Sequence, residues 1–170
     1  MHLRLANTKD ATAIATIYNQ GIQDRVATFE TRLRSPQDIK QWFDGVHPTV
    51  VLETDEREVI AFASTSAYRA RECYAGIAEF SVYVHRAFRG RGAGRLALQE
   101  LVREAAQAGF WKLLSRIFVE NTASRALVRS LGFREVGIYQ HHARLDGAWR
   151  DVVIVEKLLT ASPTLVEEVP

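Results

Sequence analysis

The sequence has very little of what marks secreted, membrane or metal-binding proteins. Cys73 is the only cysteine among 170 residues, which excludes an internal disulfide and a multi-cysteine metal site. Met1 leads into a polar segment without an apolar signal core, and nowhere do eighteen apolar residues run together. We therefore expect a cytoplasmic protein with no membrane partner.

A strong charge of either sign is also missing. The chain carries 22 basic and 20 acidic residues, and its net charge of +2 is too small to indicate a nucleic-acid partner. Its five histidines show no metal-ligand spacing, so we predict no metal. With 47% hydrophobic residues, the chain suits one globular domain, expected at residues 1–160, followed by a tail at 161–170.

The most informative stretch begins with a predicted strand at residues 78–84. Its side chains alternate between two faces, with Phe80, Val82 and Val84 on one and Glu79, Ser81 and Tyr83 on the other. The first set predicts a face that packs into the core. The second predicts a face that carries polar chemistry.

A glycine-rich turn follows this strand and opens a helix. Gly90, Gly92 and Gly94 stand at every second position, where the backbone can take positive φ and approach a ligand with no Cβ in the way. The surrounding arginines are Arg86, Arg89, Arg91 and Arg95. Because the start of a helix presents unpaired N–H groups and the positive end of its dipole, the turn predicts a site for a phosphorylated ligand.

Two common glycine loops do not fit this turn. A Walker A loop ends in Gly-Lys-Ser/Thr, whereas Gly94 is followed by Arg95 and Leu96. A dinucleotide-binding loop lies in a first βαβ unit, whereas this turn lies in mid-chain with a different glycine spacing. Neither magnesium-nucleotide nor dinucleotide binding is predicted.

The pattern of apolar residues and capping signals predicts the element order β-α-α-β-β-β-α-β-α-β-β. Strands are expected near residues 3–5, 49–53, 59–68, 78–84, 112–119, 133–143 and 149–158, and helices from 8, over 35–44, from 94 to 109 and from 121 to 132. The last two strands should form a hairpin around Asp146-Gly147. This order predicts an α/β fold with helices on both faces of a central mixed sheet.

Two motifs resemble those of the GNAT superfamily of acyl-CoA-dependent N-acyltransferases. Residues 89–94 match its pyrophosphate loop, Arg/Gln-x-x-Gly-x-Gly/Ala, and residues 121–133 match its second signature, which begins with an asparagine and ends in Leu-Gly-Phe. The resemblance extends over about residues 3–158 and implies the GNAT fold, with acetyl-CoA as co-substrate. The implied coenzyme-binding residues are Val82, Tyr83, Val84, Arg89, Gly90, Arg91, Gly92, Ala93, Gly94, Arg95, Asn121 and Ser124.

In that superfamily two parallel strands splay apart to admit the pantetheine arm, which implies contact with backbone groups near Val82 and Val84. More narrowly, residues 27–30, 74–84 and 147–152 look like the phosphinothricin, methionine sulfoximine and arsinothricin N-acetyltransferases. Those enzymes acetylate the α-amino group of toxic glutamate or methionine analogues. The resemblance implies antibiotic resistance, a small amino-acid-like acceptor and a homodimer.

Acetyl transfer requires a neutral amine, yet an α-ammonium group has a pKa of roughly 8 and is mostly protonated at neutral pH. Glu79, on the polar face of its strand, is the candidate general base. The matching glutamate of the phosphinothricin branch is its proposed base, which supports this assignment. Without the resemblance, a strand carboxylate paired with an arginine would be the simpler interpretation.

The proton donor for the departing thiolate is not evident. Val128 stands where the superfamily usually has tyrosine and this branch often has histidine, and valine cannot donate a proton. Tyr83 or Tyr139 could replace it, or the thiolate, whose thiol has a pKa of about 8.5, could leave without a dedicated acid. We favour the last of these.

For the acceptor, Arg69 and Arg71 alternate in the loop before Glu79 and could clamp a carboxylate or phosphinate, although two loop arginines could equally be solvated. Phe29, Glu30 and Tyr139 are further candidates for lining its pocket. Phe29 could instead plug the core, with Glu30 in solvent.

Two alternative functions remain open from the sequence. The first is acetylation of protein N-termini or polyamines, but paired arginines argue against a polyamine. The second is a regulator that binds acyl-CoA without catalysis, which Val128 favours. An intact Glu79 and an intact glycine loop argue against that regulator.

Overall fold

The computed structural model describes residues 1–159, so the expected tail at 161–170 lies outside the described residues. The predicted element order is confirmed. Three short 3-10 turns (Thr8–Asp10, Glu72–Tyr74 and Arg86–Phe88) accompany the main elements. The main elements are β1 (His2–Leu5), α1 (Ala11–Asp24), α2 (Pro36–Lys40), β2 (Thr49–Glu53), β3 (Val59–Ala67), β4 (Ile77–Val84), α3 (Ala93–Gln107), β5 (Lys112–Phe118), α4 (Thr122–Ser130), β6 (Arg134–Leu145) and β7 (Ala148–Leu158).

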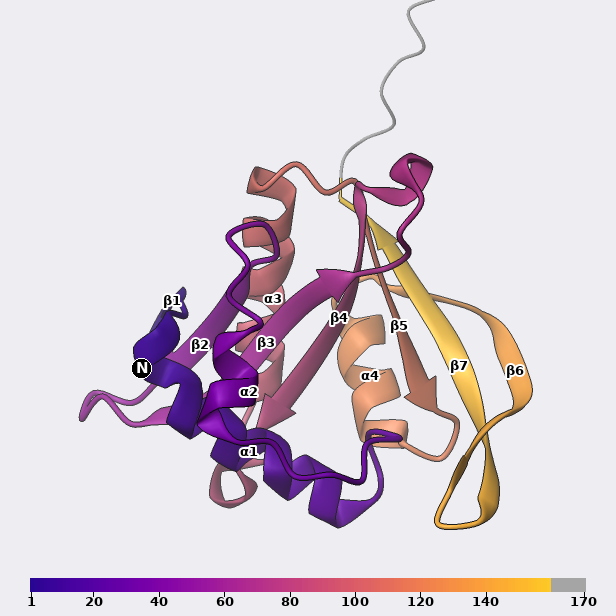
Figure 1. Cartoon of the computed structure of the whole chain (residues 1–170), viewed down its shortest axis with the longest axis horizontal. Coiled ribbons are helices and arrows are strands. Elements are labelled where there is room, and N and C mark those ends of the chain that lie inside the picture. The colour runs from indigo at the N-terminus through magenta and orange to yellow at the C-terminus, as the bar shows by residue number, and fades with distance from the viewer. Residues whose placement is uncertain (160–170) are drawn as a thin grey trace, which may run out of the picture.

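Within residues 1–159 the strands form one seven-stranded sheet in the order β1-β2-β3-β4-β5-β7-β6 (Figure 1). Every neighbouring pair is antiparallel except β4 and β5, which run parallel. The predicted mixed sheet is therefore confirmed, and its one parallel pair lies near the middle.

The parallel pair is open for most of its length. β4 and β5 are paired only at Ile77/Lys112, Ala78/Leu113 and Glu79/Leu114, whereas β4 stays paired with β3 as far as Val84. The expected splay of two parallel strands is thus present. Backbone groups beyond Glu79 on β4 and beyond Leu114 on β5 are left available at this opening.

Helices cover both faces of the sheet, with α1 and α2 on one and α3 and α4 on the other (Figure 1). Phe80 of β4 is buried in the core beneath α3, where Leu98 and Leu101 also pack. On the opposite face, the rings of Tyr83 and Phe62 stack at 5.5 Å, and Tyr18 of α1 packs edge-on to Tyr83 at 4.9 Å. The predicted alternation along β4 is correct, but Tyr83 belongs to an aromatic cluster.

The helix expected over residues 35–44 is shorter than predicted. It starts as expected, because the Ser35 hydroxyl accepts a hydrogen bond from the Asp38 N–H at 3.1 Å, but it ends at Lys40. The Asp44 carboxylate accepts the N–H groups of Val46 and His47, both at 2.8 Å, which stabilises a turn instead of a further helical turn.

The predicted hairpin between the last two strands is present. Asp146 and Gly147 have φ of 50° and 81°, as a two-residue hairpin turn requires. The pairing of β6 with β7 shifts between Tyr139 and Ala143, where His141 has φ of 47° and its N–H donates to the Asp151 carboxylate at 2.7 Å. This irregularity brings His142 to the side of the sheet where α1 lies.

Candidate active site

A cleft of about 490 Å³ lies where α1, the glycine turn and α4 meet at the open end of β4. We call it the glycine-loop cleft. Of the twelve predicted coenzyme residues, Arg91 alone is not among the described residues that line it, and its guanidinium lies 5.8 Å from the centre of the Phe88 ring. The eleven that line it are Val82, Tyr83, Val84, Arg89, Gly90, Gly92, Ala93, Gly94, Arg95, Asn121 and Ser124.

The three glycines of the turn serve two different purposes. Gly90 and Gly92 have φ of 74° and 83°, and α3 begins after Gly92 without a side-chain cap on its first N–H groups. Gly94 is helical, which corrects the expectation of positive φ there. A Cβ on Gly94 would lie 3.0 Å from Leu127 Cδ1 and 3.2 Å from Val84 Cγ2, so glycine is needed for space. The uncapped helix start fits an anionic group such as a pyrophosphate.

Two of the surrounding arginines hold the turn in place. Arg86 and Arg89 each donate to the Asp24 carboxylate at 2.6 Å, and Arg89 Nε also donates to the Val84 carbonyl at 3.1 Å. Partial burial opposes ionisation of Asp24, but the two guanidiniums outweigh it and lower its pKa below the ordinary value. Asp24 thus offsets part of the positive charge predicted for this turn and ties the turn to the end of α1.

The second motif closes the other side of the cleft. Asn121 caps α4, because its Oδ1 accepts the Ser124 N–H at 3.1 Å, and its Nδ2 donates to the Val26 carbonyl at 3.2 Å. The predicted cap is confirmed. Asn121 therefore joins the start of α4 to the segment after α1, and both Asn121 and Ser124 face the cleft.

A small cavity of about 50 Å³, which we call the passage, lies at the opening between β4 and β5. It shares Val82, Tyr83, Asn121 and Ser124 with the cleft. It also shares Ser81, Tyr83, Ser115 and Arg116 with a cavity of about 430 Å³ on the α1 side of the sheet, which we call the Glu79 cavity. The passage thus lies between the cleft and the Glu79 cavity and has lining residues in common with both.

Glu79 lines this cavity and is paired with an arginine that the sequence did not single out. Nη2 of Arg116 on β5 lies 2.6 Å from both carboxylate oxygens of Glu79. Glu79 is thus ion-paired, as the simpler interpretation predicts, and it also lines the cavity. Arg116 is the one charged residue in the otherwise apolar or small residues 113–119. A single charge in such a strand could have identified Arg116 as a candidate site residue.

The predicted acceptor residues divide into two groups. Phe29 and Glu30 line the Glu79 cavity, where Phe29 packs edge-on to Phe118 at 4.8 Å and Glu30 pairs with Arg34. Arg69 and Arg71 are exposed and lie outside the cavity, because their loop extends beyond Ala67/Ala78, the last residue pair of β3 and β4. Tyr139 also lies outside it, but its ring is 5.2 Å from that of His142, which lines the cavity.

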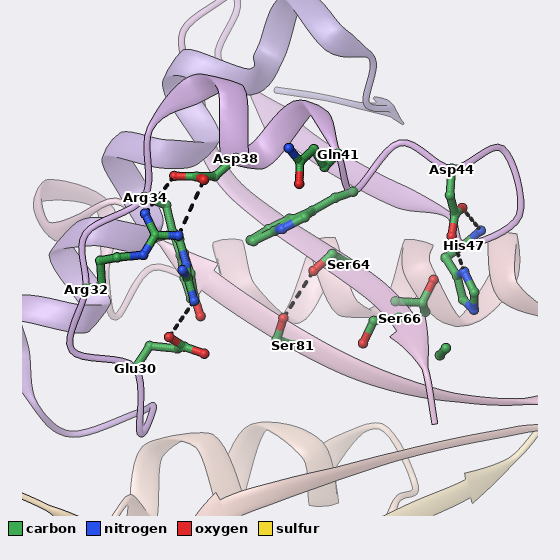
Figure 2. A pocket seen from close by; sticks show the side chains of 14 residues that line it. Glu30, Arg32, Arg34, Asp38, Gln41, Asp44, His47, Ser64, Ser66 and Ser81 are labelled. Atoms are coloured by element: carbon green, nitrogen blue, oxygen red, sulfur yellow. Dashed lines mark hydrogen bonds and ion pairs between the residues drawn. The ribbon is translucent and has the colours of Figure 1, made fainter. Parts of the chain in front are cut away.

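A second polar pocket, of about 490 Å³, adjoins the Glu79 cavity and shares Tyr18, Glu30, Ser66 and Ser81 with it (Figure 2). We call it the arginine pocket. Figure 2 shows Arg32 and Arg34 on one side of it, Asp44 and His47 on the other, and the hydrogen-bonded pair Ser64 and Ser81 between them. Its other lining residues are Asp38, Gln41, Trp42, Thr65 and Ala67.

Comparison with known proteins identifies the family. The sequence model of the acetyltransferase (GNAT) family matches residues 16–133. The chain belongs to the GNAT acetyltransferase family. Its fold is therefore the one expected from the resemblance, and this GNAT protein is an acetyl-CoA-dependent acetyltransferase.

Individual relatives are similar over nearly their whole length. YwnH of Bacillus subtilis strain 168, provisionally assigned as a phosphinothricin acetyltransferase, is 36% identical over 94% of this chain and 100% of its own. A methionine sulfoximine/methionine sulfone acetyltransferase of Salmonella typhimurium is 29% identical over 92% of this chain and 93% of its own. A phosphinothricin acetyltransferase of Sinorhizobium meliloti, solved with AcCoA, has a TM-score of 0.86 at 30% identity, covering 92% of this chain and 87% of that one. Within residues 1–159, no helix is long and apolar enough to cross a membrane.

The structure distinguishes between the two tyrosines considered as proton donors in this GNAT enzyme. Val128 lines the passage and is buried in the core, so its position has no donor. Tyr83 lines the cleft, the passage and the Glu79 cavity, whereas Tyr139 lines none of them. Burial, with the neighbouring Tyr18, raises the pKa of Tyr83 above its ordinary value, which makes its hydroxyl a weaker acid. Of the two, Tyr83 is the candidate donor by position alone.

Replacing Gly94 with valine should weaken acetyl-CoA binding by about 5- to 150-fold, which corresponds to the roughly 1–3 kcal/mol cost of overpacking. The new side chain would press on Leu127 and Val84 and displace the helix start from the pyrophosphate. Calorimetric titration with acetyl-CoA measures the effect. Gly137→Val is the control, because a Cβ there meets nothing within 4 Å. An unchanged Kd in a folded Gly94→Val variant would contradict the role of this glycine.

Proposed function

We propose that this enzyme transfers the acetyl group of acetyl-CoA to the α-amino group of a small amino-acid analogue of the phosphinothricin, methionine sulfoximine or arsinothricin type, and so confers resistance. The observation that carries the proposal is that Glu79 lies in a cavity next to the opening between β4 and β5, and that the passage at this opening shares lining residues with both the Glu79 cavity and the glycine-loop cleft. The named activities of the relatives in Salmonella and Sinorhizobium support the class of acceptor. A cytoplasmic location, expected from the sequence, and a homodimer, implied by the resemblance, are part of this proposal.

In the proposed reaction the acceptor enters the Glu79 cavity as an α-ammonium ion. Glu79 takes one proton from it, directly or through a water, and the neutral nitrogen then attacks the thioester carbon. The developing negative charge on the thioester oxygen is stabilised by a backbone N–H of β4 near Val82 or Val84, where the strand is not paired with β5. The carbon–sulfur bond breaks, and the attacking nitrogen gives up its second proton to solvent, which leaves a neutral amide. The coenzyme A thiolate takes a proton either directly from solvent or from the Tyr83 hydroxyl, which solvent then reprotonates.

The arginine pocket supports an acceptor with a second anionic group. A side chain that extends from Glu79 past Ser66 and Ser81 enters this pocket. On one wall lie Arg32 and Arg34, which pair with Asp38 and Glu30 and would have to share these contacts with the acceptor (Figure 2). Guanidinium groups suit a phosphinate, arsinate or carboxylate, since they can donate two parallel hydrogen bonds. We therefore assign the clamp predicted for Arg69 and Arg71 to Arg32 and Arg34 instead.

The proposal is tested by coenzyme A release from acetyl-CoA with a panel of acceptors. The panel contains phosphinothricin, arsinothricin, methionine sulfoximine, glutamate, methionine, spermidine and an N-terminal peptide. We expect the anionic glutamate analogues to have the highest kcat/KM. A preference for the peptide or for spermidine would contradict the proposed acceptor. Tight acetyl-CoA binding with no turnover on any of them would favour a non-catalytic regulator.

A further inference from the structure

We propose that Arg116 binds the α-carboxylate of the acceptor. In doing so Arg116 leaves Glu79, and the Glu79 carboxylate becomes accessible to the acceptor's amine. This inference rests on the proposed function and adds to it the residue that selects free amino acids. The Arg116–Glu79 ion pair is, on this view, the contact that the acceptor replaces. An amino acid enters by exchanging partners with it.

The position of Arg116 makes this exchange possible. Its side chain is 42% exposed and that of Glu79 is 24% exposed, so the pair is accessible from the cavity. Arg116 lies on β5 two residues beyond Leu114, where β5 is no longer paired with β4. It lines both the passage and the Glu79 cavity, and so it stands next to the point where the acetyl group arrives.

The chemistry of an α-amino acid requires a cation at this place. Its ammonium and carboxylate groups are attached to the same carbon, so a nitrogen that reaches Glu79 brings the carboxylate to within a few ångströms of it. Among the described residues that line the Glu79 cavity, Arg116 is the only arginine or lysine. Arg32 and Arg34 lie in the adjoining arginine pocket, where Arg32 pairs with Asp38 and Arg34 with Glu30, and they are the arginines nearest to the distal group.

The charges balance during this exchange. One ion pair, Arg116 with Glu79, is replaced by two: the ammonium with Glu79 and the carboxylate with Arg116. Each charged group therefore keeps an oppositely charged partner as water leaves the cavity, which limits the free-energy cost of desolvation. The amine is also placed against its base by the same step that binds the carboxylate.

Acceptors without an adjacent carboxylate cannot make this exchange. A peptide N-terminus carries an amide at that position and a polyamine carries a methylene, so neither offers Arg116 a replacement for Glu79. The ion pair then stays closed, and the amine does not reach the base. Arg116 thus favours free amino acids over peptides, independently of the distal anion.

The test compares L-phosphinothricin with its α-carboxamide, which has the same distal phosphinate but no α-carboxylate. In the wild type we expect kcat/KM to favour the free acid by about 10- to 100-fold, as a charged hydrogen bond would give. In Arg116→Gln this ratio should fall to about 1, mainly because KM for the free acid rises, and Arg116→Lys should retain part of the preference. A ratio that stays at the wild-type value in a folded Arg116→Gln variant overturns the inference.

Arg103→Gln serves as the matched control. Arg103 is an exposed arginine on α3 that pairs with Glu100 at 2.6 Å, outside all of these cavities, and its loss should leave the ratio unchanged. A wild-type enzyme that acetylates amino acids but does not prefer the acid over the amide also contradicts the role of Arg116, and leaves the proposed function intact. Failure to acetylate any amino acid overturns both.

Discussion

Replacing Glu79 with glutamine lowers the rate of acetyl transfer by about 10²- to 10⁴-fold, the usual contribution of a general base. Glutamine keeps the size of the side chain but cannot take the proton from the acceptor's ammonium group. Affinity for acetyl-CoA should not change, because Glu79 lines its own cavity and not the glycine-loop cleft. The variant thus separates the chemical step from binding of the coenzyme.

Steady-state kcat and a calorimetric Kd for acetyl-CoA together measure this effect. The residual rate of Glu79→Gln should rise with pH more steeply than that of the wild type, because the amine then loses its proton to solvent near its own pKa of roughly 8. Glu100→Gln, which breaks an exposed ion pair on α3, is the control and should match the wild type. Unchanged turnover in Glu79→Gln would show that another group is the base.

Replacing Phe62 with alanine destabilises the protein by roughly 3–5 kcal/mol, the usual cost of truncating a buried phenylalanine. Phe62 on β3 is fully buried. The centre of its ring lies 5.5 Å from that of Tyr83, 6.2 Å from that of Trp42 and 6.5 Å from that of Tyr18. The cavity left behind would remove the support of Tyr83, which borders the cleft, the passage and the Glu79 cavity. Such a loss is a large fraction of the stability of an ordinary domain.

Urea denaturation of the wild type and of Phe62→Ala measures the free energy of unfolding. Ile138→Ala is the control, because Ile138 on β6 is 54% exposed and its truncation should cost about 0.5 kcal/mol or less. Equal losses in the two variants would mean that the aromatic cluster between α1 and the sheet adds little to stability.

The glycine turn and the second motif could be predicted because their properties are local. Positive φ at Gly90 and Gly92, the cap at Asn121 and the start of a helix after Gly92 depend on residues only a few positions apart. The same is true of the alternation along β4, where each side chain points to the opposite face from its neighbours. Those features led to the coenzyme residues that face the glycine-loop cleft.

The acceptor site was predicted less well, because it is built from strands far apart in the sequence. Arg116 pairs with Glu79 across 37 positions, a contact that exists because β4 and β5 are neighbours and separate after three residue pairs. Arg69 and Arg71 were candidates because they alternate close to Glu79 in sequence, with solvation as the alternative, and their loop projects past the end of the sheet. Arg32 and Arg34 alternate in the same way, and they line the pocket next to Glu79.

By itself the sequence determined the order of the elements, the glycine turn and the family, because hydrophobic periodicity, caps and turn residues act over short stretches of chain. The tertiary structure alone decided which charged groups meet. It placed Asp24 against Arg86 and Arg89, and Arg116 against Glu79. Ion pairs depend on separation in space, and separation in space follows from strand order and register, which no local pattern of residues encodes.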